Sequence, residues 1–217
     1  MTRTTATAAA LLTAAALTTG ITGCRITATT ATATPAAVNA HQVLDQLAAL
    51  QLAPEDTGNH YDRDQDWPHW DRATAAGRGC DIRDQVLQQQ GHDVTTSTDG
   101  KCHVSGTWTS PYDNTTVTKT SGLQIDHVVP LKEANRSGVR GWSTTDRERF
   151  ANDTRFLLAV SIRTNEQKGD QDPARWMPPN TGYRCTYVAL WVQAKTAYRL
   201  TVDQAEHDAL AAILGKC

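Results

Sequence analysis

Residues with side chains suited to hydrolytic chemistry stand in two short stretches of this sequence. Asp126-His127 places a carboxylate beside an imidazole within the apolar run 123–131, and the segment 165–170 holds Asn165 and Lys168. Hydrolysis of a phosphodiester needs a base that activates water, a metal ion that polarises the phosphate, and a cation that holds the anion. The two stretches together contain side chains for each of these tasks.

Each of these four residues is assigned one role. His127 is the predicted general base, because an imidazole with a reference pKa of about 6.5 exchanges protons near neutral pH. Asp126 and Asn165 offer the hard oxygen ligands that Mg²⁺ prefers, with Mn²⁺ or Zn²⁺ as alternative ions. Lys168 follows Asn165 by one helical turn, so we expect it to contact a phosphate from the same helix face.

Two predicted strands and one predicted helix must bring these residues together. The apolar runs 123–131 and 156–160 are typical of buried strands, and residues 163–170 are expected to begin as a helix. Neighbouring strand residues face opposite sides, so Asp126 and His127 can serve one site only if the strand bends there. Pro130 is a candidate cause of that bend, because proline has no backbone donor.

The rest of the chain predicts an α+β fold with one domain over residues 39–217. Apolar spacing indicates helices over 41–52, 81–90 and 183–198, and a last helix to Leu214 whose capping box pairs Thr201 with Gln204. Residues 102–109 and 115–120 are predicted to form a β-hairpin. Short helical pieces are expected within 132–149, and an ordered loop held by Trp67 and Trp70 is expected before the second helix.

The first 24 residues indicate export. They carry Arg3 followed by an alanine- and leucine-rich stretch that is too short to span a bilayer. This stretch ends in Ile21-Thr-Gly-Cys24, which is similar to a bacterial lipobox, so Cys24 is the predicted lipidation site; an ordinary secretion signal is the alternative. Residues 25–38, rich in Thr and Ala, are expected to form a disordered tether. The protein would then stand on the outer face of the cell membrane through its lipid, or be secreted.

The four remaining cysteines favour disulfides over a metal site. Four cysteines permit three pairings, and we favour Cys80–Cys102 with Cys185–Cys217 because each pair closes a local loop. No Cys-x-x-Cys spacing occurs, which argues against a zinc site built from cysteine.

The residues described above resemble the HNH (ββα-metal) endonucleases, in the branch of the C-terminal nuclease domain of the GmrSD restriction enzymes. The resemblance covers roughly residues 60–217 and implies a ββα-metal core with an added β-hairpin, flanking helices and disulfides. The segments that carry it are Asp126-His-Val-Val-Pro-Leu131, Phe150-Ala-Asn-Asp153, Asn165-Glu-Gln-Lys-Gly-Asp170, Tyr61-Asp-Arg63, Cys80-Asp-Ile-Arg83, Cys102-His-Val-Ser-Gly-Thr-Trp108, Trp176-Met-Pro-Pro179 and the helix around Cys185.

One departure from that family concerns the second strand. The family usually begins this strand with Asn-Leu, and its Asn orients the catalytic loop, whereas this chain has Phe156-Leu157. Asn152 is the candidate for the missing function and is counted with His127 and Lys168 among the catalytic residues. If nothing replaces the missing Asn, His127 is held less firmly and the scaffold has little or no activity.

The charge of the whole chain does not indicate a nucleic-acid binder, because the formal net charge is −2. A local basic surface is one interpretation of the arginines near the motifs; a salt-bridged face with Glu133, Asp146 and Glu148 is the other. These arginines are Arg136, Arg140, Arg147, Arg149, Arg155 and Arg163.

The predicted function is an exported, monomeric, metal-dependent endonuclease that cleaves DNA or RNA with little sequence preference, since no sequence-reading module accompanies the motifs. The alternatives are a non-catalytic envelope lipoprotein that uses a degenerate HNH scaffold for binding, and a hydrolase of another phosphodiester.

Overall fold

A computed structural model describes residues 38–217. The predicted signal segment, Cys24 and nearly all of the predicted tether lie outside the described residues. Within residues 38–217, no helix is both long enough and apolar enough to cross a membrane.

The two predicted buried strands pair in the middle of the molecule. Strands β4 (Leu123–His127) and β5 (Leu157–Ser161) are antiparallel, and the register places His127 opposite Leu157. Every residue of β5 is buried, as its apolar sequence predicts. Helix α6 (Ile162–Lys168) follows β5 without a loop, because Ser161 caps its first turn by accepting from the backbone N–H of Thr164.

Apolar side chains cover both faces of this two-stranded sheet. Ile125 and Leu157 pack toward helix α3 (Ile82–Gln90) and Trp108, whereas Leu158 and Val160 belong to the core that helix α7 (Arg184–Tyr198) covers. The outer edge of β5 is also occupied, because the side-chain amide of Gln90 donates to the carbonyl of Leu157 and accepts from the N–H of Ala159. One glutamine thereby completes the backbone hydrogen bonds that a third strand would make.

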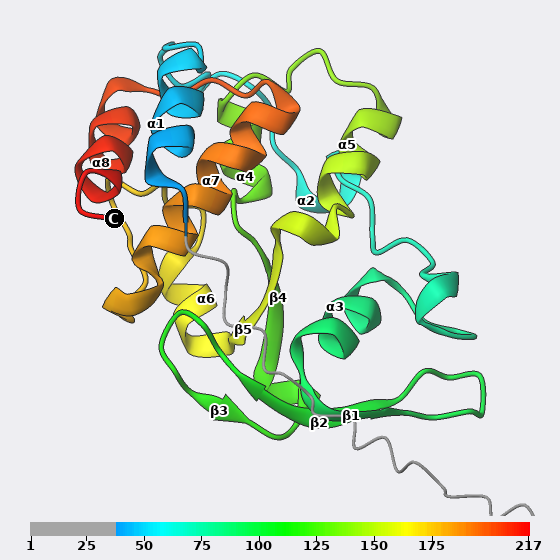
Figure 1. The fold of residues 1–217 in the computed structure, drawn as a ribbon. Helices are drawn as coiled ribbons and strands as arrows, with labels where there is room; N and C mark the ends of the chain where they lie inside the picture. Colours follow the sequence, from blue (N-terminus) through cyan, green and yellow to red (C-terminus); the bar gives the residue numbers. More distant parts are fainter. Residues whose placement is uncertain (1–37) are drawn as a thin grey trace, which may run out of the picture. The chain divides into compact units, whose positions relative to one another are not determined.

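A second, three-stranded sheet lies at one end of the molecule (Figure 1). Its strands are β1 (His92–Thr96), β2 (Val104–Thr109) and β3 (Thr116–Val117), all antiparallel to their neighbours. The β2–β3 hairpin was predicted, and Asn114 in its turn adopts the left-handed backbone conformation that asparagine tolerates. Strand β1 was not predicted, because Val94 is its one aliphatic residue and the strand pairs through an irregular register.

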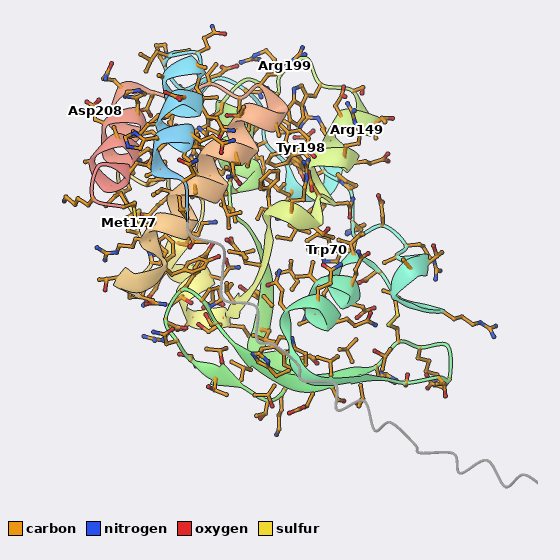
Figure 2. All side chains as sticks on the ribbon, in the orientation of Figure 1. Trp70, Arg149, Met177, Tyr198, Arg199 and Asp208 are labelled. Carbon is orange, nitrogen blue, oxygen red and sulfur yellow. A yellow bond between two sulfur atoms is a disulfide. The ribbon has the colours of Figure 1, made fainter. Side chains whose placement is uncertain are left out.

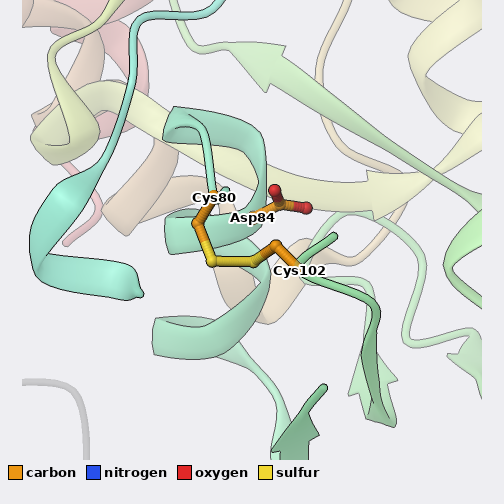
Figure 3. Close-up of side chains that lie close together, drawn as sticks. All are labelled: Cys80, Asp84 and Cys102. Carbon is orange, nitrogen blue, oxygen red and sulfur yellow. A yellow bond between two sulfur atoms is a disulfide. The ribbon is translucent and has the colours of Figure 1, made fainter. Parts of the chain in front are cut away.

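Two disulfides fix the ends of the helical elements, and both have the favoured pairing. Cys80–Cys102 joins the start of α3 to the loop before β2 (Figure 3). Asp81 caps α3 in a capping box with Asp84, directly after the first of these cysteines. Cys185–Cys217 joins the first turn of α7 to the C-terminus.

Three packed helices form the opposite end of the molecule from the three-stranded sheet (Figure 1). They are α1 (Ala40–Ala49), α7 (Arg184–Tyr198) and α8 (Gln204–Leu214). The predicted cap of the last helix was wrong, because Asp203, and not Thr201, accepts from the backbone N–H of Glu206. On α7, the buried ammonium of Lys195 donates to Glu133 and Glu206.

Short helices connect these layers and carry several of the residues discussed below. They are α2 (Arg63–Asp66), α4 (Leu131–Arg136) and α5 (Thr144–Ala151), together with the short turns of 3-10 helix Thr74–Ala76, Thr120–Gly122, Thr154–Phe156 and Thr181–Tyr183. Helix α4 begins directly after Pro130, so the chain leaves β4 and turns into a helix within three residues.

Candidate active site

An open pocket is lined by residues of β4 and α6. Asp126, His127 and Asn165 line it together with Tyr61 and Arg63, so three of the predicted site residues share one cavity. The predicted bend is not required, because β4 keeps regular pairing through His127.

The imidazole of His127 is held in one orientation by a backbone group. Its Nε2 lies 2.9 Å from the carbonyl oxygen of Ala151, the last residue of α5. Because a carbonyl can only accept, Nε2 carries the proton and Nδ1 keeps its lone pair. Trp70, labelled in Figure 2, stacks on the ring with 5.3 Å between centroids and 11° between planes.

The charge state of His127 follows from its surroundings. Burial, reinforced by the nearby positive charges of Lys168 and Arg63 and opposed by the hydrogen bond to Ala151, lowers the pKa of His127 to about 4. At neutral pH the ring is therefore uncharged, and its Nδ1 has no hydrogen-bond partner among residues 38–217.

Lys168 is buried, which corrects the prediction that it contacts a phosphate. Its side chain is 0% exposed, and Nζ donates to both carboxylate oxygens of Asp126 at 2.7 and 2.8 Å and to the carbonyl of His127 at 2.7 Å. An ammonium has three protons, so all of its donors are in use. Lys168 instead holds the end of β4 through the carboxylate of Asp126 and the backbone carbonyl of His127.

Asp126, the other predicted metal ligand beside Asn165, is the anion of this buried pair. Its Oδ2 also accepts from the hydroxyl of the buried Tyr112. Burial raises the pKa of the Asp126 carboxyl, and the adjacent ammonium of Lys168 opposes that rise. A carboxylate has about four acceptor positions, so these three hydrogen bonds leave roughly one, on Oδ1, for a further partner.

Asn165 offers the clearest ligand atom in the pocket. Its Nδ2 donates to Oε1 of Gln124 at 2.8 Å, which orients the amide and leaves Oδ1 without a partner among the described residues. Asn165 is not a helix cap, because Ser161 has that position in α6.

The donors of this pocket fit a hard divalent cation. Asn165 Oδ1 and the remaining position on Asp126 Oδ1 are neutral and anionic oxygens in one cavity, a set that suits Mg²⁺ or Mn²⁺ better than Zn²⁺. The positive charge of Lys168 opposes the cation, so we expect weak binding. Cys80, Asp84 and Cys102 also cluster in the described part of the chain, but their sulfurs form the disulfide shown in Figure 3.

Asn152 does not contact His127, in contrast to the orienting role that was predicted. Its Oδ1 accepts from the backbone N–H of Asp71 at 3.0 Å, and its Nδ2 donates to the carbonyl of Glu148 at 3.1 Å. Asn152 thereby fixes the end of α5, where the neighbouring carbonyl of Ala151 holds the imidazole. Any effect of Asn152 on His127 passes through that backbone group.

The six arginines near the motifs do not form a free basic surface. Five of them pair with acids, as the second interpretation predicted, although Glu148 is not among the partners. The pairs join Arg136 to Glu55, Glu133 and Asp170, Arg140 to Asp56, Arg149 to Asp146, Arg155 to Asp153, and Arg163 to Asp113. The guanidinium of the sixth, Arg147, lies over the ring of Trp67.

Several residues of the site were missed at the level of the sequence. Ala151 acts through its backbone, which has no residue-specific signal, and Tyr112 was taken for a turn residue. Trp70 was expected to hold a loop but not to contact His127. Arg63 and Tyr61 were noted within a motif without a role.

Comparison with known proteins identifies one matching family and one similar protein. Residues 81–213 match the family described as GmrSD restriction endonucleases, C-terminal domain. An uncharacterized secreted protein of Arthroderma benhamiae is 41% identical over 202 residues, which cover 88% of this chain and 96% of that protein. No solved structure matches this chain.

Proposed function

Because the chain belongs to the family of GmrSD restriction endonuclease C-terminal domains, we propose that it is an exported, metal-dependent endonuclease acting on DNA or RNA with little sequence preference. The observation that carries this proposal is the imidazole of His127, which is neutral, is oriented by the carbonyl of Ala151 and lines the pocket. We further propose that β4, β5 and α6 form the ββα-metal core of that family.

His127 is the general base in this proposal. Its Nδ1 takes a proton from a water molecule as the water oxygen attacks phosphorus, while Nε2–H remains donated to the carbonyl of Ala151. Lys168 and Arg63 disfavour the imidazolium, so the proton is released again to solvent after the reaction. Stacking on Trp70 keeps the ring from rotating and covers one of its faces.

Asp126 and Asn165 are the proposed metal ligands, through the free acceptor position and Oδ1 described above. These two residues would hold a divalent ion, which would supply polarisation of the scissile phosphate and stabilisation of the leaving oxygen. Gln124 fixes the amide of Asn165, and Lys168 and Tyr112 fix the carboxylate of Asp126, so both ligand side chains are preorganised.

Export is supported by the two disulfides and by the relative that is described as secreted. Attachment to the membrane through a lipid on Cys24, a tether over residues 25–38 and a monomeric state belong to the proposal.

Substrate and metal are tested with the purified protein. Supercoiled plasmid, single-stranded RNA and a small chromogenic phosphodiester are each incubated with Mg²⁺, with Mn²⁺ and with EDTA. We expect nicking of the plasmid or cleavage of the RNA with either ion and none with EDTA. Cleavage of the small ester alone would favour a different phosphodiesterase, and no cleavage of any substrate would favour the non-catalytic envelope protein.

A further inference from the structure

Arg63 is a cation that faces the active-site pocket and has no ion-pair partner within residues 38–217. It lines the same cavity as His127 and Asn165. We infer that Arg63, together with the hydroxyl of Tyr61, forms the subsite that binds the substrate phosphate. This inference rests on the proposed function and supplies the anion-binding group that the burial of Lys168 removes from it.

The guanidinium of Arg63 is anchored at one end and open at the other. Its Nη1 donates to the carbonyls of Trp67 at 3.2 Å and Pro68 at 3.0 Å. The described residues provide no hydrogen-bond acceptor for its Nε and Nη2, which form the fork that binds phosphate oxygens in two places. Holding one nitrogen lowers the entropy that the side chain loses when it binds an anion.

Tyr61 adds a neutral donor beside this fork. Its side chain is partly buried, and the hydroxyl has no hydrogen-bond partner in the described part of the protein. Burial raises the pKa of Tyr61, so its hydroxyl stays protonated at neutral pH and can donate to a phosphate oxygen.

Other nearby cations are already committed. Lys168 is buried against Asp126, and Lys132 lies 3.2 Å from Asp170. Arg136 is bound to three acids. Arg63 therefore differs from them in combining access to the pocket with unused donors.

Arg63 lies in the segment of the chain that precedes helix α3. It lies before residue 81, where the match to the family model begins, although the motif Tyr61-Asp-Arg63 belongs to the resemblance described for the sequence. The segment that holds α2 would then be part of the active site and not an accessory to it, with Arg63 and Tyr61 on one side of the pocket and Trp70 against His127.

Binding of a fluorescein-labelled DNA duplex by the full chain in EDTA tests the subsite without cleavage. Fluorescence anisotropy is measured over a series of salt concentrations for wild type, Arg63→Ala, Arg63→Lys, Tyr61→Phe and Arg78→Ala, the last being an exposed arginine outside the pocket. We expect Arg63→Ala to weaken binding about 10- to 100-fold, as for a lost charge-assisted hydrogen bond. The slope of log K against log salt should become shallower by about 0.9, as for one lost phosphate contact.

The remaining variants separate charge from geometry. Arg63→Lys should keep the salt slope but lose part of the affinity, Tyr61→Phe should weaken binding a few-fold at constant slope, and Arg78→Ala should change neither. Equal losses in Arg63→Ala and Arg78→Ala, or no binding by wild type, would overturn the inference. A lowered melting temperature of Arg63→Ala would make its loss of affinity ambiguous. In that case the affinities of Arg63→Lys and Tyr61→Phe decide whether the subsite exists.

This experiment can fail separately from the proposed function. Binding that depends on Arg63 without any cleavage in Mg²⁺ would refute the endonuclease and leave an anion-binding pocket. Cleavage with unchanged KM in Arg63→Ala would leave the endonuclease and refute the subsite.

Discussion

Replacing Lys168 by Met separates a structural ion pair from a substrate contact. The substitution keeps the length of the side chain and removes its charge. It leaves the carboxylate of Asp126 buried with Tyr112 as its remaining partner, and it leaves the carbonyl of His127 without its donor.

The expected loss is large because one charge of a buried pair is left uncompensated. Breaking such a pair costs about 3–5 kcal/mol of the free energy of unfolding. For a domain of this size that corresponds to a fall in melting temperature of roughly 6–20 °C. The loss should shrink at low pH, because Asp126 then binds a proton and no longer carries a buried charge.

Urea unfolding at pH 7 measures this loss, with Lys132→Met as the matched control. Lys132 is 51% exposed in its pair with Asp170, so its replacement should change stability by less than about 1 kcal/mol. The double variant Asp126→Asn, Lys168→Met should lose less than the sum of the single variants. A loss below about 1 kcal/mol in Lys168→Met, joined to a raised KM for nucleic acid, would refute the buried pair and restore the phosphate contact.

Three further predictions concern the acid, the metal and the disulfides. Because burial lowers the pKa of His127 to about 4, the unfolded chain binds a proton there that the folded protein excludes. Lowering the pH from 6.5 to 4 should therefore reduce the free energy of unfolding of wild type by about 3 kcal/mol more than that of His127→Gln, measured by urea unfolding. Equal pH dependence of the two proteins would contradict this. Asn165→Ala should weaken Mn²⁺ binding at least several-fold in calorimetry while Gln167→Ala, an exposed neighbour in α6, leaves it unchanged; unaltered affinity would remove Asn165 from the ligands. Reduction should destabilise the protein by about 3–4 kcal/mol for each disulfide, and four free thiols in exported protein would contradict both bridges.

The parts of the fold that could be predicted are those with a local signal. The apolar runs of β4 and β5 and the polar helix after β5 were found at nearly their true bounds. The disulfide pairing followed from loop length. Strand β1 was missed because a mostly polar sequence forms it, and its stability comes from pairing with β2 and not from its own pattern.

The parts of the site that could not be predicted depend on contacts between distant residues. Nothing in the sequence distinguishes an exposed Lys168 from a buried one, because its burial requires Tyr112 and Asp126 to meet across the core. The group that orients His127 is the backbone carbonyl of Ala151, which no residue type signals. The predicted orienting residue, Asn152, is the next residue in the chain and makes other hydrogen bonds.

Mg²⁺-dependent plasmid nicking by His127→Ala is the most direct test of His127 as the general base. The control is His103→Ala, which removes an exposed imidazole outside the pocket. We predict that His127→Ala loses at least about 100-fold in nicking rate, as for a lost general base. His103→Ala should keep the wild-type rate, and both variants should stay folded. Equal nicking by wild type and His127→Ala would contradict it.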